Sequence, residues 1–366
     1  MSEIGIIGTS WWVDSMYLPA LAGLDGVDVV AIAGRDPERT EDRATQWHIA
    51  SVHTDWRQML DEVELTGLVV AAANPVHYPA TRAALERGID VLCEKPVADT
   101  WAEAIELAEL AEAAGAVTMV PFTYAFMPGF RFLERLVSDG YVGRIHHIGL
   151  RYHAGYANHG DYLWKLDARK NPTGALGDLG SHFLYLALRL GGDVAALTAR
   201  LDSVGHHAAT DAGGDPYPVA ADSAAVILEF SSGAQGILHA SSVAHEGTSM
   251  DQLHAIEVHG AEGTVKYICD WDHTQEVTGS RVGEGPLRPI PIPDDIWGGV
   301  RRDSVHDTYR DVFRTTDAMA RGWARALATR SPVRPDLREG AAVQALLDAG
   351  LESSRTGRRV SIGGGA

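Results

Sequence analysis

Cysteine and lysine are both scarce in this chain of 366 residues. The two cysteines, Cys93 and Cys269, cannot build a disulfide framework, and the chain has no CxxC pair that would hold zinc. Only four of its 31 basic residues are lysines, so each lysine needs an explanation. Because 49 acidic residues bring the formal net charge to −18, the composition argues against a nucleic-acid or anionic-membrane surface.

Long apolar runs are missing as well. The run at residues 68–73 is far below the roughly 20 residues that a membrane-spanning helix needs. The first residues lack the basic and apolar stretches of a secretory signal, so we expect a cytoplasmic protein without a membrane or nucleic-acid partner. With 45% hydrophobic and 22% charged residues, the chain is typical of soluble globular proteins, and its length predicts two domains.

The pattern of the chain changes near residue 122. Up to that point short β-rich runs alternate with helical patterns, which predicts a parallel sheet covered on both faces. Gly88 and Gly115 stand where helix ends require a left-handed residue. We expect strands at 4–7, 27–33, 68–73, 89–93 and 117–120, and helices at 18–24, 37–47, 56–63, 75–87 and 100–114.

The second part of the chain has fewer helices and many strand-like segments in neighbouring hairpins. This arrangement predicts an antiparallel or mixed sheet with one face against helices. The expected fold class is therefore α/β, with a dinucleotide-binding domain at 1–122 and an α+β domain at 123–366. We expect strands at 146–153, 196–204, 223–231, 235–244, 254–260 and 264–269, helices at 128–137, 176–190, 303–329 and 338–353, and long loops at 205–221 and 279–300.

The first expected strand runs into Gly8-Thr9-Ser10-Trp11-Trp12-Val13 and then into a helix. This is the position of a Rossmann phosphate loop, in which glycines let the backbone approach a pyrophosphate at the helix amino terminus. Only the first glycine of the motif is present, since Ser10 and Val13 stand at the other two positions. The segment therefore predicts either a bound dinucleotide or an empty structural turn.

The end of the second expected strand, Gly34-Arg35-Asp36 with Arg39 one turn later, bears on the choice of coenzyme. NAD enzymes place an acidic residue at the strand end to hold the ribose 2′-hydroxyl. An arginine there suits a 2′-phosphate instead, which favours NADP over NAD. The alternative is that Arg35 and Asp36 form an ordinary turn before a helix that starts at Pro37.

The sharpest local pattern is Val91-Leu92-Cys93-Glu94-Lys95-Pro96, in which an apolar strand ends in a carboxylate, a lysine and a proline. The carboxyl ends of parallel strands are where ligands bind in open α/β folds. Lys95 is therefore a candidate for binding or catalysis. The alternative is a solvated lysine in a strand-to-helix loop.

A second pattern, residues 174–182, opens a helix. Asp178, His182, Tyr185 and Arg189 share one helical stripe, because they are spaced by four, three and four residues. Asp178 and His182 can therefore point into one cavity, and the neighbouring glycines admit close approach. The alternatives are Asp178 as a helix cap and His182 as a core histidine.

Together these residues suit hydride transfer from a secondary alcohol. A histidine that titrates near neutrality can take the hydroxyl proton, which gives His182 an acid–base role. The ammonium of Lys95 can stabilise a developing alkoxide. Asp178 can hold a neighbouring hydroxyl or orient His182.

The segment 152–165 is rich in aromatic and polar side chains. Aromatic faces stack on sugar rings and polar groups bind hydroxyls, so Tyr156, His159 and Trp164 are substrate-binding candidates. The alternative is a surface loop with packing aromatics. The histidines of the chain form no compact ligand set, and no metal is expected.

These motifs, taken in order, resemble the Gfo/Idh/MocA family, which is named for glucose–fructose oxidoreductase, inositol dehydrogenase and a rhizopine-catabolism protein. The resemblance runs nearly from end to end. It rests on the segments Gly5 to Ser10, Ala73 to His77, Glu94-Lys95-Pro96, Gly177 to His182 and Val258 to Thr264. Glu-Lys-Pro combined with Asp-x-Gly-x-His at this separation is specific, whereas either motif alone is not.

The resemblance implies a Rossmann domain followed by an α+β domain with a large open, mostly antiparallel sheet. That sheet would carry the interface of a homo-oligomer, a dimer or tetramer. Asn74 and His77 would line the nicotinamide, Glu94 and Lys95 would reach its ribose, and the Lys95–Pro96 bond would be cis. The implied catalytic group is Lys95, Asp178 and His182. The expected cofactor-binding residues are Gly8, Thr9, Ser10, Trp11, Trp12, Gly34, Arg35, Arg39, Asn74, His77, Glu94 and Lys95.

Some residues depart from the family's pattern. Trp11 and Trp12 follow the glycine loop and either wall the nicotinamide or pack at the helix start. Ala125 and Tyr185 stand where many members have arginine and aspartate, and both lie near the expected substrate pocket. Tyr124, beside Ala125, is a further substrate candidate. Sugars, inositols and related polyols are the implied substrates, and no single one is carried over.

Three classes of function remain at this point. The leading prediction is an NAD(P)-dependent oxidoreductase that moves a hydride between the nicotinamide and a carbinol carbon of a sugar or cyclic polyol. The second is a redox-neutral glycoside hydrolase or lyase that keeps its NAD(H). The third is a non-catalytic nucleotide-sensing protein, which the degraded glycine loop favours and the intact Lys95, Asp178 and His182 argue against.

Overall fold

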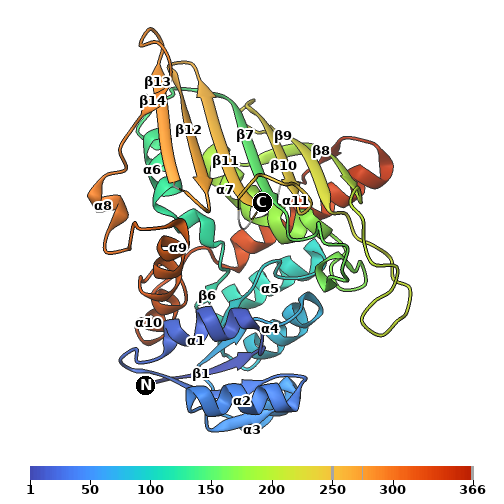
Figure 1. Cartoon of the computed structure of the whole chain (residues 1–366). Coiled ribbons are helices and arrows are strands. Elements are labelled where there is room, and N and C mark those ends of the chain that lie inside the picture. The colour runs from blue at the N-terminus through green and yellow to red at the C-terminus, as the bar shows by residue number, and fades with distance from the viewer. Residues whose placement is uncertain (249–250, 274, 364–366) are drawn as a thin grey trace. The chain divides into compact units, whose positions relative to one another are not determined.

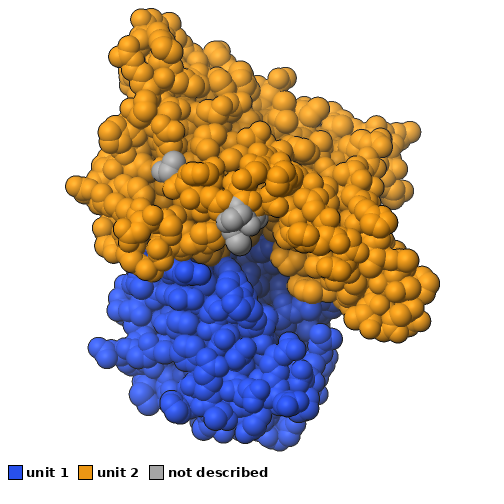
Figure 2. Space-filling view, in the orientation of Figure 1, with its two compact units in different colours: residues 1–123, 310–344 blue, residues 124–309, 345–366 orange. Residues whose placement is uncertain are grey.

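The structure, a computed structural model, describes residues 1–248, 251–273 and 275–363 and divides into two compact units (Figure 1). Unit 1 comprises residues 1–123 and 310–344, and unit 2 comprises residues 124–309 and the described residues from 345 onward; Figure 2 colours them separately. The chain returns to unit 1 within helix α9 (Val305–Arg314) and leaves it within helix α11 (Leu337–Thr356). Among the described residues, no helix has both the length and the apolar character that crossing a membrane requires.

A six-stranded sheet forms the centre of unit 1. Its strands are β1 (Ser2–Ile7), β2 (Val27–Ala33), β3 (Ser51–His53), β4 (Gly67–Val70), β5 (Asp90–Cys93) and β6 (Thr118–Met119). They lie in the order β3-β2-β1-β4-β5-β6 and all pair in parallel, which confirms the predicted parallel sheet. The order reverses between β1 and β4, and open α/β sheets bind ligands at such a point, outside the carboxyl ends of the strands.

Helices cover this sheet on both faces, since every side chain of β4 and β5 is buried. The helical segments of unit 1 are η1 (Val13–Tyr17), α1 (Leu18–Leu21), α2 (Pro37–Trp47), α3 (Trp56–Glu62), η2 (Asn74–Val76), α4 (His77–Leu85), α5 (Trp101–Ala114) and α10 (Ala320–Thr329), with parts of α9 and α11. Local sequence sets the ends of α5. Thr100 and Glu103 form a reciprocal capping box at its start, and Gly115 ends it with φ at +60°.

Helix α10 completes unit 1 from a distant part of the chain. Its Trp323 is fully buried and donates the indole N–H to the carbonyl oxygen of Val117 at 3.0 Å. Gly67 makes room for this ring, because a Cβ at that position would lie 2.9 Å from it. The expected division at residue 122 did not include this return of residues 310–344 to the first unit.

Unit 2 is built on a nine-stranded sheet. Its strands are β7 (Ile145–Ala154), β8 (Val194–Asp202), β9 (Ser223–Phe230), β10 (Gln235–Ser241), β11 (Gln252–Gly260), β12 (Gly263–Asp270), β13 (Gln275–Arg281), β14 (Arg288–Pro289) and β15 (Val360–Ser361). The order is β14-β13-β12-β11-β7-β10-β9-β8-β15. Strands β7 and β10 pair in parallel and the other described pairs are antiparallel. The prediction of a large open, mostly antiparallel sheet is confirmed.

Among the described residues, helices cover one face of this sheet and leave the other open. Segments η5 (Leu176–Gly180), α6 (Pro128–Ser138) and α7 (Ser181–Gly191) contact the strands, and the buried residues of β9 and β12 alternate with more exposed ones. On the uncovered face Ile227 of β9 pairs directly with Ile237 of β10, and these side chains are 53% and 62% exposed. The remaining helical segments are η3 (Thr123–Phe126), η4 (Trp164–Leu166) and α8 (Asp294–Trp297).

Two predictions about secondary structure were wrong. The single helix expected at 303–329 is divided into α9 and α10, because the hydroxyls of Thr315 and Thr316 donate to carbonyl oxygens of the last turn of α9. The long loop expected at 279–300 contains the end of β13, strand β14 and helix α8. Strand β3 was not predicted, because three residues are too short to show a pattern.

Candidate active site

The loop after β1 needs its one glycine. Gly8 has φ at +129°, and a Cβ there would lie 2.3 Å from the carbonyl oxygen of Ala71, which follows β4. Gly34, at the end of β2, is equally tight, because a Cβ would lie 2.5 Å from the side chain of Thr9. The two glycines therefore hold the loop against the ends of both neighbouring strands.

The helix that follows this loop fits a dinucleotide phosphate without the other two glycines. Val13 is fully buried, so its side chain fills the core below the loop. Ser10 and Trp11 are exposed at the helix start, and Trp11 is 66% exposed. The amino terminus of a helix at the carboxyl edge of a parallel sheet offers backbone N–H groups to a phosphate. The residues present thus fit the predicted dinucleotide.

Glu94 joins the end of β5 to this same helix. One carboxylate oxygen of Glu94 accepts the indole N–H of Trp12 at 2.8 Å and the hydroxyl of Tyr17 at 2.7 Å. The other accepts the backbone N–H of Lys95 at 3.2 Å. Phe313 packs edge-on against both aromatic rings, at 5.4 and 5.1 Å. Trp12 thus contacts Glu94 and Phe313 at the helix start, and its contact with a nicotinamide stays a prediction.

His77 is a buried link between two loops of unit 1. Its ring is 1% exposed, with Nδ1 2.7 Å from the carbonyl oxygen of Pro96 and Nε2 3.1 Å from that of Ala72. Burial lowers its pKa, which outweighs the opposite effect of these two carbonyl groups. In its neutral form the ring has a single N–H and donates to one of these two carbonyl oxygens, beside Lys95, whose bond to Pro96 is cis. Neighbouring Asn74 is also buried, and contact of either residue with a nicotinamide stays a prediction.

The end of β2 has an exposed arginine beside a capped helix. Asp36 accepts the backbone N–H of Arg39 at 3.1 Å and caps α2. The guanidinium of Arg39 lies 3.6 Å from the same carboxylate, and both side chains are at least half exposed. Arg35 is exposed at this turn. The turn therefore starts a helix in the ordinary way and also leaves Arg35 at the surface.

In unit 2, Asp178 is bound by two side chains of the preceding loop. One carboxylate oxygen accepts the hydroxyl of Tyr156 at 2.7 Å and the ammonium of Lys165 at 2.9 Å, and the other oxygen lies 3.1 Å from the same ammonium. Burial and the charge of Asp178 raise the pKa of Tyr156 well above its ordinary value, so that hydroxyl keeps its proton and donates. Asp178 lies inside η5 and holds these side chains instead of capping the helix.

His182 follows one turn later, at the start of α7, beside an aromatic wall. It is 8% exposed, and its ring centre is 4.7 Å from that of Tyr124. The Tyr124 hydroxyl is 2.8 Å from that of Tyr152, and the amide of Gln252 donates to both at 3.3 and 3.1 Å. His254 packs on the same tyrosines, and burial lowers its pKa to about 3. This wall is fixed, and a contact of buried Tyr124 with substrate stays a prediction.

The other predicted substrate residues lie on the loop before η5. His159 is exposed and Trp164 is 40% exposed. The loop is anchored by Asp167, which is fully buried and accepts two hydrogen bonds from the guanidinium of Arg169 at 2.6 and 2.8 Å. Arg169 also binds Asp211 at 2.8 Å, which joins this loop to the one expected at 205–221. The exposed side chains are therefore presented by an anchored segment.

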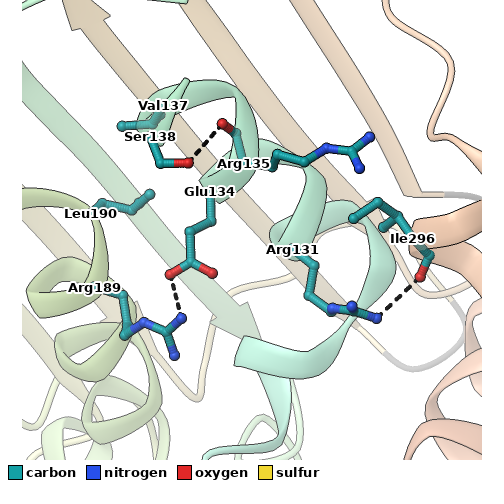
Figure 3. A pocket seen from close by; sticks show the side chains of 8 residues that line it. All are labelled: Arg131, Glu134, Arg135, Val137, Ser138, Arg189, Leu190 and Ile296. Atoms are coloured by element: carbon teal, nitrogen blue, oxygen red, sulfur yellow. Dashed lines mark hydrogen bonds and ion pairs between the residues drawn. The ribbon is translucent and has the colours of Figure 1, made fainter. Parts of the chain in front are cut away.

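A separate pocket of about 520 Å³ is lined by α6 from Arg131 to Ser138, by the last turn of α7 and by residue 296 of α8 (Figure 3). Arg131 donates to the carbonyl oxygen of Ile296 at 3.2 Å, and Arg189 binds Glu134 at 2.7 Å. Arg189 lies in the last turn of α7, where the helix dipole favours a cation. The pocket contains none of the predicted site residues. Within residues 1–248, 251–273 and 275–363, no group of three or more candidate ligands could hold a metal ion.

Comparison with known proteins places the fold and the site in a wider group. Residues 2–122 match the description "Oxidoreductase family, NAD-binding Rossmann fold", and residues 134–362 match "Oxidoreductase family, C-terminal alpha/beta domain", the two parts of Gfo/Idh/MocA proteins. The chain belongs to the Gfo/Idh/MocA oxidoreductase family.

Relatives within the Gfo/Idh/MocA family include dehydrogenases of several polyhydroxylated compounds. D-apiose dehydrogenase of Paraburkholderia graminis is 24% identical over 94% of this chain and 86% of its own. Inositol 2-dehydrogenase of Rhizobium meliloti is 26% identical over 98% and 99%. The solved structure of levoglucosan dehydrogenase with NADH and levoglucosan has the same fold, with a TM-score of 0.85 at 21% identity over 99% of each chain.

Sequence reasoning missed three polar contacts of this Gfo/Idh/MocA member. Lys165 was noted only as the last residue of an aromatic segment. The chain has only four lysines, and this scarcity could have identified Lys165 as a candidate. Tyr17 and Gln252 gave no signal, because their partners Glu94 and Tyr152 are 77 and 100 residues away in the chain. The predicted catalytic residues belong to both units: Lys95 to unit 1, and Asp178 and His182 to unit 2.

Proposed function

We propose that this protein is an NAD(P)-dependent dehydrogenase that oxidises a secondary hydroxyl of a sugar or cyclic polyol, or reduces the corresponding carbonyl. The observation that carries the proposal is the position of Lys95. Its backbone is bound by Glu94, which also binds Trp12 and Tyr17 of the helix that follows the phosphate loop. Lys95 is thereby held at the carboxyl edge of the sheet, where a nicotinamide coenzyme would bind.

Three side chains, those of His182, Lys95 and Asp178, have separate roles in the proposed reaction. A bound nicotinamide coenzyme supplies the acceptor, or the donor, of a hydride. As the carbinol becomes a carbonyl, the imidazole of His182 accepts the hydroxyl proton. The ammonium of Lys95 stabilises the negative charge on the same oxygen. The ionised carboxylate of Asp178 accepts a hydrogen bond from a neighbouring hydroxyl of the substrate.

The test is an assay of the purified protein with NAD⁺ or NADP⁺ and a panel of myo-inositol, scyllo-inositol, levoglucosan and D-apiose. We expect at least one of these compounds to produce reduced nicotinamide, followed by its absorbance. Reactions without coenzyme and without polyol are the controls. Binding of coenzyme without turnover of any compound would contradict the proposal. Cleavage of a glycoside with no net change in absorbance would favour the redox-neutral class instead.

We also propose that NADP(H) is the preferred coenzyme. Arg35 is exposed at the end of β2, where its guanidinium can bind a 2′-phosphate bidentately. We expect NADPH to bind more tightly than NADH in calorimetric titrations, and Arg35→Ala to weaken NADPH binding by about tenfold while leaving NADH unchanged. Arg57→Ala, at another exposed arginine of unit 1, is the matched control. Tighter binding of NADH by the wild-type protein would overturn this preference.

The uncovered face of the nine-stranded sheet is the proposed surface of self-association. Ile227 and Ile237 form an exposed apolar pair there, and exposed apolar patches mark association sites. We expect the double variant Ile227→Asp/Ile237→Asp to shift a dimer or tetramer to monomer in size-exclusion chromatography with light scattering. Val282→Asp, at a residue 77% exposed outside this face, should leave the mass unchanged. A wild-type monomer would refute the proposal.

A further inference from the structure

The carboxylate of Asp178 is already bound by a lysine of its own unit. The ammonium of Lys165 lies 2.9 and 3.1 Å from its two oxygens, and Tyr156 donates to one of them at 2.7 Å. We infer that Lys165 is a positioning residue, which holds Asp178 ionised and oriented for the reaction. This inference rests on the function proposed above.

The geometry of the pair differs from that of an ordinary surface ion pair. Asp178 is only 12% exposed, whereas Lys165 is 40% exposed, so the lysine reaches inward to a carboxylate that water scarcely contacts. The ammonium also lies 5.2 Å from the centre of the Tyr156 ring, within range of a cation–π interaction. Each of the three side chains therefore contacts the other two. Charge-assisted bonds of this kind are about twice as strong as neutral ones.

The backbone beneath Lys165 is fixed as well. The buried amide of Asn171 donates to the carbonyl oxygen of Lys165 at 2.8 Å and to that of Gly174 at 3.1 Å. Thr173 in turn donates to the Asn171 amide oxygen at 3.0 Å. Because Gly174 leads directly into η5, the segment that carries Asp178 is tied to the segment that carries Lys165. The backbone of Lys165 is thus bonded to the backbone that leads to Asp178.

In this arrangement Asp178 and His182 have different roles. A carboxylate that accepts bonds from an ammonium and a hydroxyl stays ionised, so it acts as an acceptor and not as the proton-transferring group. His182, one turn further along, is left to exchange the proton. A substrate hydroxyl that binds Asp178 shares the carboxylate with Tyr156 and Lys165. These two donors therefore restrict the direction from which the hydroxyl can approach the carboxylate.

The inference is tested with Lys165→Met, which keeps most of the length of the unbranched side chain and removes its charge. We expect kcat/KM on the best substrate of the panel to fall on the order of 10- to 100-fold, mainly through kcat. Without the cation the carboxyl group binds a proton at higher pH, so the acidic limb of the kcat/KM profile should move upward. Lys165→Arg should restore most of the activity and the original profile.

Lys170→Met is the matched control on the same loop. Lys170 is 43% exposed, binds the hydroxyl of Tyr162 at 2.7 Å and lies 3.6 Å from Asp167, away from Asp178. Lys170→Met should leave the pH profile of kcat/KM unchanged. Circular dichroism should show that all variants are folded. If the wild type is active and Lys165→Met retains its kcat/KM and profile, the positioning role alone is overturned. If the wild type turns over no compound of the panel, the proposed function fails first and this role falls with it.

Discussion

The His182→Asn variant is expected to lose about 10²- to 10⁴-fold in kcat, the range that general acid–base catalysis contributes. Asparagine is close to histidine in size and can still donate a hydrogen bond, but it cannot take up the hydroxyl proton. The side chain is 8% exposed and packs against Tyr124, so a substitute of similar shape should preserve the wall behind it. Steady-state kinetics on the best substrate, with coenzyme binding measured in parallel, provide the check.

The control makes the same chemical change at His48. That residue is exposed and ends α2 with φ at +57°, a conformation that asparagine tolerates well, so His48→Asn should keep full activity. Combining His182→Asn with Lys95→Met tests whether the two residues act on one oxygen. If they do, the double variant should lose far less than the product of the single losses. Turnover within a few-fold of wild type in His182→Asn would contradict the acid–base assignment.

Trp323→Ala is expected to destabilise unit 1 by about 3–5 kcal/mol, the usual range for removing a large buried aromatic side chain. The ring is fully buried against Gly67, which has no side chain to fill the space that would be left. The carbonyl oxygen of Val117 would also lose one of its two donors and keep only the backbone N–H of Val91, at 3.3 Å. Urea-induced unfolding followed by circular dichroism should show the transition of unit 1 at a clearly lower urea concentration.

Two further variants serve as comparisons for the loss of stability in Trp323→Ala. Trp56→Ala removes a partly exposed tryptophan of the same unit, beneath Arg57, and should cost far less. Trp323→Phe keeps most of the apolar contact but removes the indole N–H, so its cost should lie between the other two. Equal midpoints for Trp323→Ala and Trp56→Ala would show that α10 does not support the sheet as described.

The parts of the fold that follow from short-range physics were predicted from the sequence. The alternation of strands and helices gave the parallel sheet, and the expected left-handed glycines are present, with Gly88 at φ +74° and Gly115 at +60°. Helix starts at Asp36 and Thr100 follow from side chains that cap their own helices. Each of these features depends on residues within a few positions of one another.

What the sequence did not reveal depends on partners far apart in the chain. The bond between Trp12 and Glu94 spans 82 residues. The packing of Trp323 on Gly67 joins helix α10 to strand β4, which lie far apart in the sequence. Strand β13 was missed because its Gly279 and charged residues hide a one-sided burial pattern. Lys165 was closer at hand, 13 residues from Asp178, and the scarcity of lysine was the signal that could have identified it.

The late return of residues 310–344 to unit 1 has a consequence for biosynthesis. The first 123 residues are translated long before Trp323, so the side of their sheet at Gly67 lacks the cover of helix α10 until that helix has been made. All of unit 2 up to residue 309 emerges in the interval. Residues 1–123 therefore keep an apolar surface exposed at Gly67 until residues 310–344 have been translated and can cover it.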